Sequence, residues 1–388
     1  MKPILFFTIL LPLFCTDAFS QLYPTFGPEK KVTVTGLTFD AMEPFISPDD
    51  NILFFNSLNS GGNTNLYYAA KVNDTTFTYA GLVSGTFDPA PNHLDAVASV
   101  DASNNFFWTS LRDYPDQIAN LRRGTFSDGN VSGISPVFGD FNIDDFNFPF
   151  GWLIMDAAIN YQGDLLYYTN AKFDFSNTTC VGIPCEAKLG VAALVNDNTF
   201  NKLPDSDAIF ANVNDPENYL VYAPQITPDG LELYYTRLLK NSVNTEICVS
   251  VRTSATEPFS LPSVIHANPG FLPEAASPST DQQKIYYHQK DQSGVFRLYL
   301  RYRTQTAGVA EHARKMARAY PNPTSGLLNI STDDAAADIL VTVYSIVGQE
   351  MFSAPNATSV DMSHFAAGLY YVVISQDNNT WTGKIIKQ

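Results

Sequence analysis

One pattern of apolar and polar residues recurs five times between residues 43 and 305. Each copy has a short apolar stretch, a polar turn, and a second stretch that contains a pair of adjacent aromatic or large apolar residues. The copies are Glu43–Ser57, Asp95–Ser110, Asp156–Asn170, Ala223–Arg237 and Glu274–Gln289. Two alternating stretches around a tight polar turn are typical of a β-hairpin. The repeat therefore predicts five successive hairpins.

Additional strands follow most hairpins. Third strands are predicted at Asn65–Val72, Lys188–Val195, Glu246–Val251 and Phe296–Arg303, and fourth strands at Phe77–Val83 and Leu261–Ile265. Four strands per copy are typical of a β-propeller blade. The fifth copy lacks its own outer strand, and Lys31–Leu37 could supply it, which would remove an open sheet edge. We therefore predict an all-β fold, with a five-bladed β-propeller over residues 21–305.

The chain changes character after the last copy. Residues 306–318 are polar without a strand pattern and are interpreted as a linker. Residues 319–388 form a second unit, with predicted strands at Ile339–Ser345, Gly368–Ser375 and Thr380–Ile386. Their alternation and β-branched content predict a small C-terminal β-sandwich.

Two copies carry a more specific turn, Pro44–Asp50 and Pro224–Gly230, in which Ser/Thr–Pro–Asp precedes the aromatic strand. These repeats resemble the WD-like propeller repeats of the Tol-associated family. The other three copies lack the full turn. The resemblance implies the fold, which hosts many unrelated functions.

The C-terminal unit contains ordered motifs: Tyr320–Pro321–Asn322–Pro323, a segment 343–349 with Gly348, Val360–Ser363, Gly368–Tyr370, and a final Lys384–Lys387. Together they resemble the type A C-terminal sorting domain of type IX secretion substrates. The resemblance implies that residues 319–388 contact the secretion machinery. It also implies passage across the outer membrane, followed by surface attachment or release. An ordinary accessory sandwich is the alternative interpretation.

The first 20 residues have the features of a signal peptide. Lys2 precedes the apolar run Ile4–Leu11, and Ala18 and Ser20 are small residues placed for cleavage before Gln21. Lipid attachment at Cys15 is the alternative, which the bulky Phe14 disfavours. No later stretch reaches about 18 consecutive apolar residues, so no transmembrane segment is predicted. The predicted location is secreted or cell-surface.

Charge and cysteine content refine this interpretation. The 388 residues include 23 basic and 39 acidic side chains, for a net charge of −16, which argues against nucleic acid as a partner. Export permits disulfides, and Cys180 and Cys185 lie in one turn-rich loop. We predict a local disulfide between them, with a metal or redox site as the alternative. Cys248 lies in a strand pattern and is expected to be buried.

The common catalytic motifs GxSxG, HExxH and Walker A are absent. Two other regions contain candidate binding or catalytic residues. The first region is the start of the inner strand in four copies, where Glu43, Asp95, Asp156 and Glu274 stand; Ala223 occupies this position in the fourth copy. Ring closure would bring these acids together as a cation site, a glycoside-hydrolysing pair, or acceptors for sugar hydroxyls. The structural alternative is that each acid caps amides of the next blade.

The second region is the aromatic and acidic loop 138–152. Its candidate ligand-binding residues are Asp140, Asp144, Asp145, Phe148 and Trp152. Asp140, Asn142 and Asp144 have the spacing of a calcium loop, but Asp145 and Gly151 replace its Gly and Glu, so no cofactor beyond a possible Ca²⁺ is predicted. Exposed aromatic residues suit sugar or peptide binding, and packing between blades is the alternative.

These features favour a secreted, non-catalytic propeller that binds a glycan, peptide or protein. A secreted glycoside hydrolase that uses the inner-strand acids is the alternative. A periplasmic partner of the Tol type is the third hypothesis, and the sorting motifs argue against it.

Overall fold

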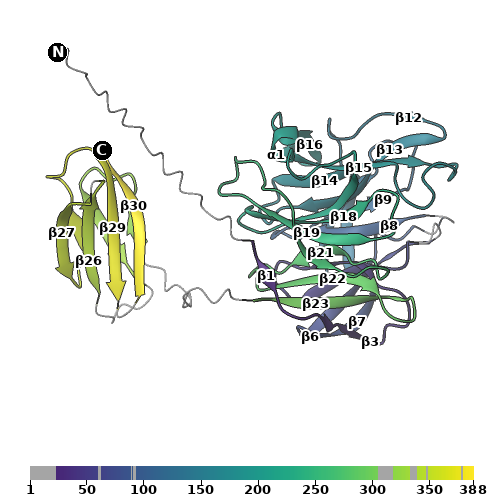
Figure 1. Ribbon diagram of the computed structural model, residues 1–388, viewed down its shortest axis with the longest axis horizontal. Coiled ribbons are helices and arrows are strands. Elements are labelled where there is room, and N and C mark those ends of the chain that lie inside the picture. The colour runs from purple at the N-terminus through teal and green to yellow at the C-terminus, as the bar shows by residue number, and fades with distance from the viewer. Residues whose placement is uncertain are drawn as a thin grey trace, which may run out of the picture. The chain divides into compact units, whose positions relative to one another are not determined.

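Strands make up nearly all regular structure in the computed structural model, which describes residues 23–59, 63–88, 90, 93–304, 318–332, 339–346, 348–376 and 379–388. The chain divides into two compact units, Met1–Thr304 and Gln305–Gln388 (Figure 1). The predicted signal peptide, residues 1–20, lies outside the described residues. So does the predicted linker 306–318, except for Arg318.

The described part of unit 1 contains five sheets, each built mainly from consecutive antiparallel strands. Blade one contains β4 (Met42–Ile46), β5 (Ile52–Asn56), β6 (Leu66–Asn73), β7 (Thr76–Leu82) and, parallel to β7, β3 (Thr33–Thr35). Blade two contains β8 (Asp95–Val100), β9 (Asn105–Ser110), β10 (Leu121–Ser127) and β11 (Asn130–Pro136). Blade three contains β12 (Phe146–Asn147), β13 (Phe150–Ile159), β14 (Leu165–Asp174), β15 (Glu186–Asn196) and β16 (Thr199–Lys202).

The last two blades complete the unit. Blade four contains β17 (Tyr219–Ile226), β18 (Glu232–Leu239), β19 (Thr245–Val251) and β20 (Ser263–Ala267), and the short helix α1 (Ser206–Ile209) precedes it. Blade five contains β21 (Glu274–Pro278), β22 (Lys284–Lys290), β23 (Phe296–Thr304), and two strands from the start of the chain, β1 (Thr25–Phe26) and β2 (Lys30–Lys31). The inner strands contact one another in the closed cycle β4, β8, β13, β17, β21 and back to β4. This arrangement confirms the predicted all-β propeller.

The pair of large residues in the second strand of each blade explains how the blades pack. The pairs are Phe54–Phe55, Phe106–Phe107, Tyr167–Tyr168, Tyr234–Tyr235 and Tyr286–Tyr287, all at most 2% exposed. Successive side chains point to opposite faces of a sheet. Phe54 therefore packs with blade two, in one apolar cluster with Phe106, while Phe55 packs with blade five, in another with Tyr286. Each pair thus fills the two gaps beside its own blade.

The hairpin turns share one hydrogen-bonding device, although their sequences differ. A polar side chain at the first turn position accepts hydrogen bonds from amides up to five residues later. These residues are Ser47, Asp101, Asn160, Thr227 and Ser279. In blades two and three, Asp101 and Asn160 do this without the Ser/Thr–Pro–Asp sequence. A carboxylate or amide oxygen replaces the hydroxyl as the acceptor, so the turn tolerates the loss of the motif.

The N-terminal segment closes the ring differently from the prediction. The predicted closing strand was Lys31–Leu37, but β1 and β2 pair with β23, and β3 pairs with β7 of blade one instead. Val32 explains the difference, because it is 4% exposed in the apolar cluster shared by blades one and five. With Val32 buried in the seam, the residues before it serve blade five and those after it serve blade one. The closing strands are therefore Thr25–Phe26 and Lys30–Lys31.

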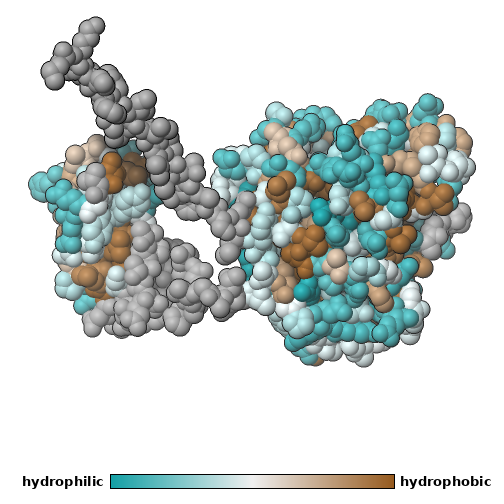
Figure 2. Space-filling view, viewed as in Figure 1, coloured by the Kyte–Doolittle hydropathy of each residue, from teal (hydrophilic) through white to brown (hydrophobic). Residues whose placement is uncertain are grey.

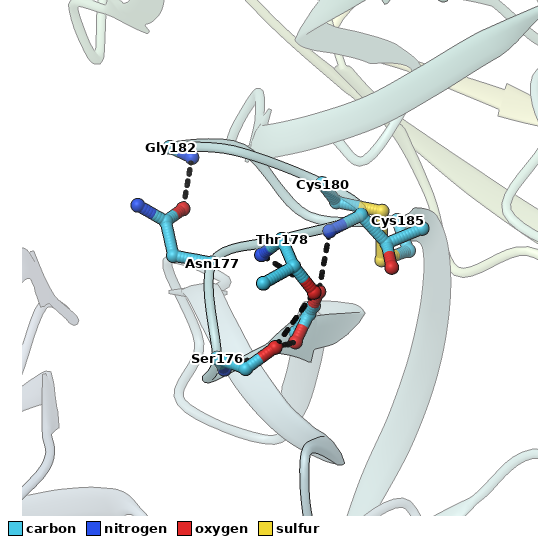
Figure 3. The surroundings of a disulfide bond; sticks show 8 residues. Ser176, Asn177, Thr178, Cys180, Gly182 and Cys185 are labelled. Carbon is cyan, nitrogen blue, oxygen red and sulfur yellow. Dashed lines mark hydrogen bonds between the residues drawn. A yellow bond between two sulfur atoms is a disulfide. The ribbon is translucent and has the colours of Figure 1, made fainter.

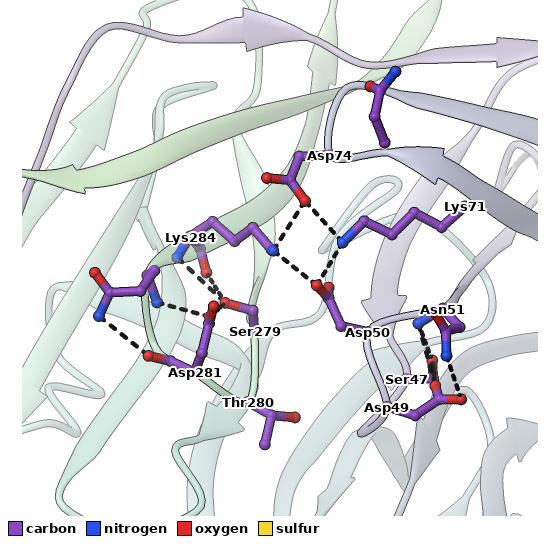
Figure 4. Close-up of polar contacts among 12 residues, drawn as sticks. Ser47, Asp49, Asp50, Asn51, Lys71, Asp74, Ser279, Thr280, Asp281 and Lys284 are labelled. Carbon is purple, nitrogen blue, oxygen red and sulfur yellow. Dashed lines mark hydrogen bonds and ion pairs between the residues drawn. The ribbon is translucent and has the colours of Figure 1, made fainter. Parts of the chain in front are cut away.

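An ion-pair network reinforces the same seam (Figure 4). The Nζ atom of Lys284 in blade five lies 2.8 Å from Oδ2 of Asp50 and 3.0 Å from Oδ1 of Asp74, both in blade one. The Nζ atom of Lys71 lies 2.5 Å and 2.7 Å from the same two atoms. Burial tends to raise the pKa of Asp74, but hydrogen bonds from the two lysines lower it to about 2. The charges of two lysines and two carboxylates thus balance at the seam between blades one and five.

Lys284→Met is expected to destabilise the propeller by about 1–2 kcal/mol, because it removes a largely buried ammonium group and leaves two partly buried carboxylates with one lysine. Lys202→Met is the matched control, since Lys202 pairs with Asp207 at 2.8 Å on the surface. An exposed pair contributes about 0–1 kcal/mol. Urea unfolding of both variants measures the difference. Equal losses would show that the seam network adds no more than a surface pair.

Unit 2 contains two facing sheets. One has β24 (Arg318–Tyr320), β25 (Leu327–Ser331) and β28 (Ser359–Asp361), and the other has β27 (Glu350–Pro355), β26 (Leu340–Ser345), β29 (Gly368–Gln376) and β30 (Asn379–Lys387). Their inward side chains form one core that includes Leu328, Val343 and Val372, each 0% exposed. This is the predicted small β-sandwich.

The first and last sorting motifs meet in unit 2. The side-chain amide of Asn322 donates to the carbonyl of Lys384 at 2.8 Å and accepts from the amide of Ile386 at 2.9 Å. Tyr370 is 6% exposed, and its hydroxyl donates to the carbonyl of Ala366 at 2.9 Å. Gly348 has a φ of 79°, which favours glycine. These motif residues therefore have structural roles inside the sandwich.

Candidate functional site

Every inner strand is interrupted by a β-bulge near the position of the predicted acids. In four blades a bulge residue has a positive φ, and its amide donates to a side chain of the preceding blade. The pairs are Glu43 with His288, Val97 with Asn56, Ala223 with Asp156, and Ala275 with Thr236. A positive φ is costly for these residue types, and the interblade hydrogen bond offsets that cost. The bulges are therefore a repeated joint between blades.

Asp156 takes part in this joint, as the structural alternative predicts. It is 3% exposed, and its Oδ2 accepts a hydrogen bond from the amide of Ala223 at 3.1 Å. Glu43 and Glu274 do something else with their carboxyl groups. Oε1 of Glu43 accepts from the side-chain amide of Asn59 at 3.0 Å, and Oε1 of Glu274 accepts from the hydroxyl of Tyr222 at 2.9 Å. Capping of an amide in the next blade therefore explains the carboxyl group of Asp156 but not those of Glu43 and Glu274.

Three of the four predicted acids form one electrostatic group with two further side chains. We call Glu43, Asp156, Tyr222, Glu274 and His288 the inner-strand cluster. Burial raises the pKa of Glu43 to about 8, with contributions from Asp156 and Glu274. Burial also raises the pKa of Asp156 to about 7, against the amide of Ala223 and with a contribution from Glu274. These three carboxyl groups therefore influence one another electrostatically.

Asp95 is not part of this cluster. It is 0% exposed, its Oδ1 accepts from the indole Nε1 of Trp108 at 3.0 Å, and its Oδ2 lies 3.7 Å from Nη2 of Arg112. Burial raises the pKa of Asp95, while Trp108 and Arg112 oppose the shift. Within blade two, Asp95 therefore has one hydrogen-bonded oxygen and a second oxygen that only faces the charge of Arg112.

Sequence reasoning missed His288 and Tyr222. The signal for His288 is its place directly after the large-residue pair of the second strand, where the other copies have Asn56, Trp108, Thr169 and Thr236. Three of these five side chains, Asn56, Thr236 and His288, hold the bulge of the next blade. The residue after the pair is thus a readable marker of the interblade joint.

Glu43→Gln is expected to raise stability at pH 8 by at least about 1 kcal/mol and to change it little at pH 4. The pKa of Glu43 is higher in the folded protein than in the unfolded chain, so the folded state binds an extra proton between about pH 4.5 and 8. Stability from this group is present at low pH and is lost as the pH rises through 8. Thermal melts of both proteins at several pH values measure this. A pH-independent difference would contradict the prediction.

The loop 138–152 contributes to a cleft of about 800 Å³. The cleft lies between this loop and residues 115–119 of blade two, and its lining includes Asp116, Phe138, Asn142, Asp144 and Phe146. The register places it at the end of the propeller where the inner strands begin. The β13–β14 hairpin continues beyond the pair Asp156–Thr169 as far as Phe150–Asp174. The face of unit 1 in Figure 2 is largely hydrophilic, with separate hydrophobic patches.

Of the five predicted loop residues, only Asp144 lines the cleft. Oδ1 of Asp140 accepts from the amide of Lys202, and the carbonyl of Asp145 accepts from the amide of Trp152 at 3.1 Å. The Trp152 ring lies below the ammonium groups of Lys172 and Lys188, and Phe148 is 69% exposed. In the described part of the chain, no group of three or more His, Cys, Asp or Glu side chains is arranged to hold a metal ion.

The neighbouring loop carries a disulfide between Cys180 and Cys185 (Figure 3). Oδ1 of Asn177 accepts from the amide of Gly182 at 2.8 Å across this loop. The ring of Phe175, just before the loop, packs on Tyr114 and Phe146 with centroids 5.7 Å apart in each case. The disulfide loop therefore lies beside the wall of the cleft. Cys248 is buried and free, and burial raises its pKa to about 12.

Comparisons with known proteins agree with the division of the chain. A family model described as a secretion system C-terminal sorting domain matches residues 318–388. No curated protein matches the chain. No helix among the described residues is long and apolar enough to cross a membrane.

Solved structures that are similar include three carbohydrate-active enzymes. A family 117 glycoside hydrolase from Zobellia galactanivorans is 12% identical, with a TM-score of 0.45, over 78% of this chain and 96% of that one. An α-L-arabinofuranosidase from Podospora anserina is 12% identical, with a TM-score of 0.46, over 73% and 98%. An endo-arabinase from Bacteroides thetaiotaomicron is 11% identical, with a TM-score of 0.40, over 72% and 98%. These values say nothing about the activity of this chain.

The family match and the sandwich geometry concern the same residues, since β24 begins at Arg318 and β30 ends at Lys387. Residues 318–388 are a secretion-system C-terminal sorting domain, and the protein is exported by type IX secretion to the cell surface or the extracellular space.

Proposed function

We propose that the protein is a secreted, non-catalytic propeller that binds a neutral glycan in the cleft over blades two and three. In this proposal residues 1–20 direct export from the cytoplasm, residues 21–305 bind the ligand, and the sorting domain completes secretion. The observation that carries the proposal is the cleft of about 800 Å³, in which aromatic rings and polar side chains lie together.

The chemistry of the lining favours a sugar. Phe138 is 47% exposed, which leaves a ring face available for stacking against a pyranose or furanose ring. Asp116 and Asp144 offer carboxylate acceptors for hydroxyl groups. Asn142 also lines the cleft, and its side-chain amide donates to the carbonyl of Gly139 at 3.3 Å. The net charge of −16 disfavours acidic ligands and favours a neutral one.

Phe138→Ala is expected to weaken glycan binding at least tenfold, because it removes the stacking surface. The backbone of Phe138 pairs with residues 198–200, so the substitution keeps the local fold. Phe148→Ala is the matched control, since Phe148 is exposed in the same loop and outside the cleft lining. A glycan array identifies the ligand. Isothermal titration calorimetry then measures its affinity for the wild-type protein and the two variants. Binding of peptides alone, or equal binding by both variants, would contradict the proposal.

Glycoside hydrolysis by the inner-strand cluster is the second candidate. The observation in its favour is that Glu43 and Asp156 have raised pKa values, about 8 and 7, beside a third carboxyl group, Glu274. Such shifts are frequent in acid–base catalysts. Against it, Asp156 already accepts the amide of Ala223 as part of the interblade joint. Hydrolysis of the selected glycan that is lost in Glu274→Gln would favour the enzyme.

The turns at Ser47 and Thr227 also support a relation to the Tol-associated WD-like repeats. In each turn the side-chain hydroxyl donates to an Asp two residues later and accepts from backbone amides further on. We propose this relation for the fold of the blades only, and we propose no partner shared with that family.

A further inference from the structure

His288 has one ring nitrogen whose role is fixed by its neighbour. The residue is 0% exposed, and its Nδ1 accepts a hydrogen bond from the amide of Glu43 at 2.9 Å. A ring nitrogen that accepts carries no proton, so the proton of this neutral imidazole is on Nε2. Nε2 has no hydrogen-bond partner, and Oε2 of Glu274 is 3.6 Å away, beyond hydrogen-bond distance. A buried N–H donor therefore points at the inner-strand cluster without an acceptor.

One carboxyl oxygen of the inner-strand cluster is also unpaired. Oε2 of Glu43 is buried without a partner. Glu274 uses Oε1 for the hydroxyl of Tyr222, and its Oε2 faces the imidazole. Glu43, Tyr222 and Glu274 are each partly exposed, so the inner-strand cluster reaches the surface, although Nε2 of His288 and Oε2 of Glu43 are themselves covered. Leaving a buried donor and a buried acceptor unpaired is costly, which points to a missing partner.

Hydrogen-bond roles restrict what this partner can be. An ammonium group or a metal ion cannot accept a hydrogen bond from the Nε2 proton. An anion would lie against three carboxyl groups. A hydroxyl group can accept from Nε2 and donate to a carboxyl oxygen at the same time. An oxygen at normal hydrogen-bond distance from both Nε2 of His288 and Oε2 of Glu274 forms a triangle whose base is 3.6 Å.

We infer that the inner-strand cluster is a second ligand site, which binds a hydroxyl group of a polyol or carbohydrate between His288 and the carboxyl groups of Glu43 and Glu274. The three side chains that hold the hydroxyl group come from blades one and five, and the inner-strand cluster does not share a residue with the cleft. It therefore does not depend on the function proposed for the cleft. Water offers the same hydroxyl chemistry, and the test distinguishes the two sources.

The test follows the Nε2 proton of His288 in the full chain labelled with ¹⁵N-histidine. Glycerol and glucose are the probes, and His288→Gln assigns the signal by its loss. Both probes are expected to slow solvent exchange of this proton in a saturable manner. 1,2-Dimethoxyethane, which accepts but cannot donate, and methylamine, which is a cation, are expected to have no effect. No saturable effect of glycerol and glucose, as with water alone at the site, overturns the inference.

Three variants complete the test. Glu274→Gln is expected to weaken the polyol effect at least tenfold, because an amide replaces the carboxyl group that faces His288. Asp95→Asn is the matched control, since Asp95 holds the corresponding inner-strand position but is hydrogen-bonded to Trp108 and faces the guanidinium of Arg112. Phe138→Ala separates this site from the cleft and should leave the polyol effect unchanged. Equal weakening in Asp95→Asn, or loss of the effect in Phe138→Ala, overturns the inference. The probes act on the wild-type protein even if Glu274→Gln fails to fold.

Discussion

Deletion of residues 21–31 is expected to unfold the propeller or to lower its Tm by more than about 10 °C. The deletion removes β1 and β2, which are the outer strands of blade five, and leaves the edge of β23 unpaired. It also removes Glu29, whose Oε2 accepts from the hydroxyl of Tyr287 at 2.9 Å. The guanidinium of Arg301 loses the carbonyl acceptors of Phe26 and Gly27. The summed loss is expected to exceed about 5 kcal/mol.

Substitution of both Lys30 and Lys31 by alanine is the control for this deletion. Their side chains are exposed, so the backbone pairing with β23 remains and the Tm should change by less than about 2 °C. Differential scanning calorimetry of the three proteins, with analytical ultracentrifugation to detect aggregation at the open edge, gives the answer. A deleted protein that melts with the full-length protein would show that the ring does not need these strands.

The propeller fold was predictable because each blade repeats the same packing problem. The pairs of large residues in the second strands are visible in the sequence, and each one fills two gaps between blades. The polar residue that opens each turn is visible in the same way. A repeat of this kind reports the fold because its residues contact only their own blade and the two adjacent ones.

The closing segment was less predictable, because its position depends on burial across the seam. The alternation from Lys31 to Leu37 fits an outer strand of either blade five or blade one. Only the burial of Val32 between the two blades decides which residues pair with β23 and which with β7. That information belongs to the closed ring and is absent from any single repeat.

The candidate site was partly predictable for the same reason. Ring symmetry predicts that acids at one repeat position lie near one another, and Glu43, Asp156 and Glu274 do interact electrostatically. Symmetry cannot reveal local partners, and Asp95 is separated from the group by Trp108 and Arg112 of its own blade. The contribution of residues 115–119 to the cleft was missed too, since it depends on how two loops of different length meet.

Deletion of residues 318–388 is expected to abolish secretion and to leave the propeller folded in the periplasm of the native host. The sorting domain has its own core and forms a compact unit separate from the propeller. The last strand of the propeller, β23, ends at Thr304. Immunoblots of periplasm, cell surface and medium follow secretion, and the melting curve of the purified propeller reports its fold. Surface display or release of the truncated protein would show that this domain is not the signal for secretion.

A single substitution tests whether secretion requires a correctly folded sorting domain. Asn322→Ala removes the two hydrogen bonds that join the first sorting motif to the last strand, at Lys384 and Ile386. The expected cost is about 1–3 kcal/mol for the isolated unit, with a several-fold loss of secretion. Asn356, which directly follows β27, is unsuitable as a control because its side chain accepts a hydrogen bond from the amide of Ile339. Ser353→Ala is preferable, since Ser353 is exposed on β27 and its replacement removes only a hydroxyl contact with Thr342 at 3.2 Å, with no backbone partner. If Asn322→Ala and Ser353→Ala were secreted equally well, the machinery would read a surface of the sandwich that does not depend on this joint.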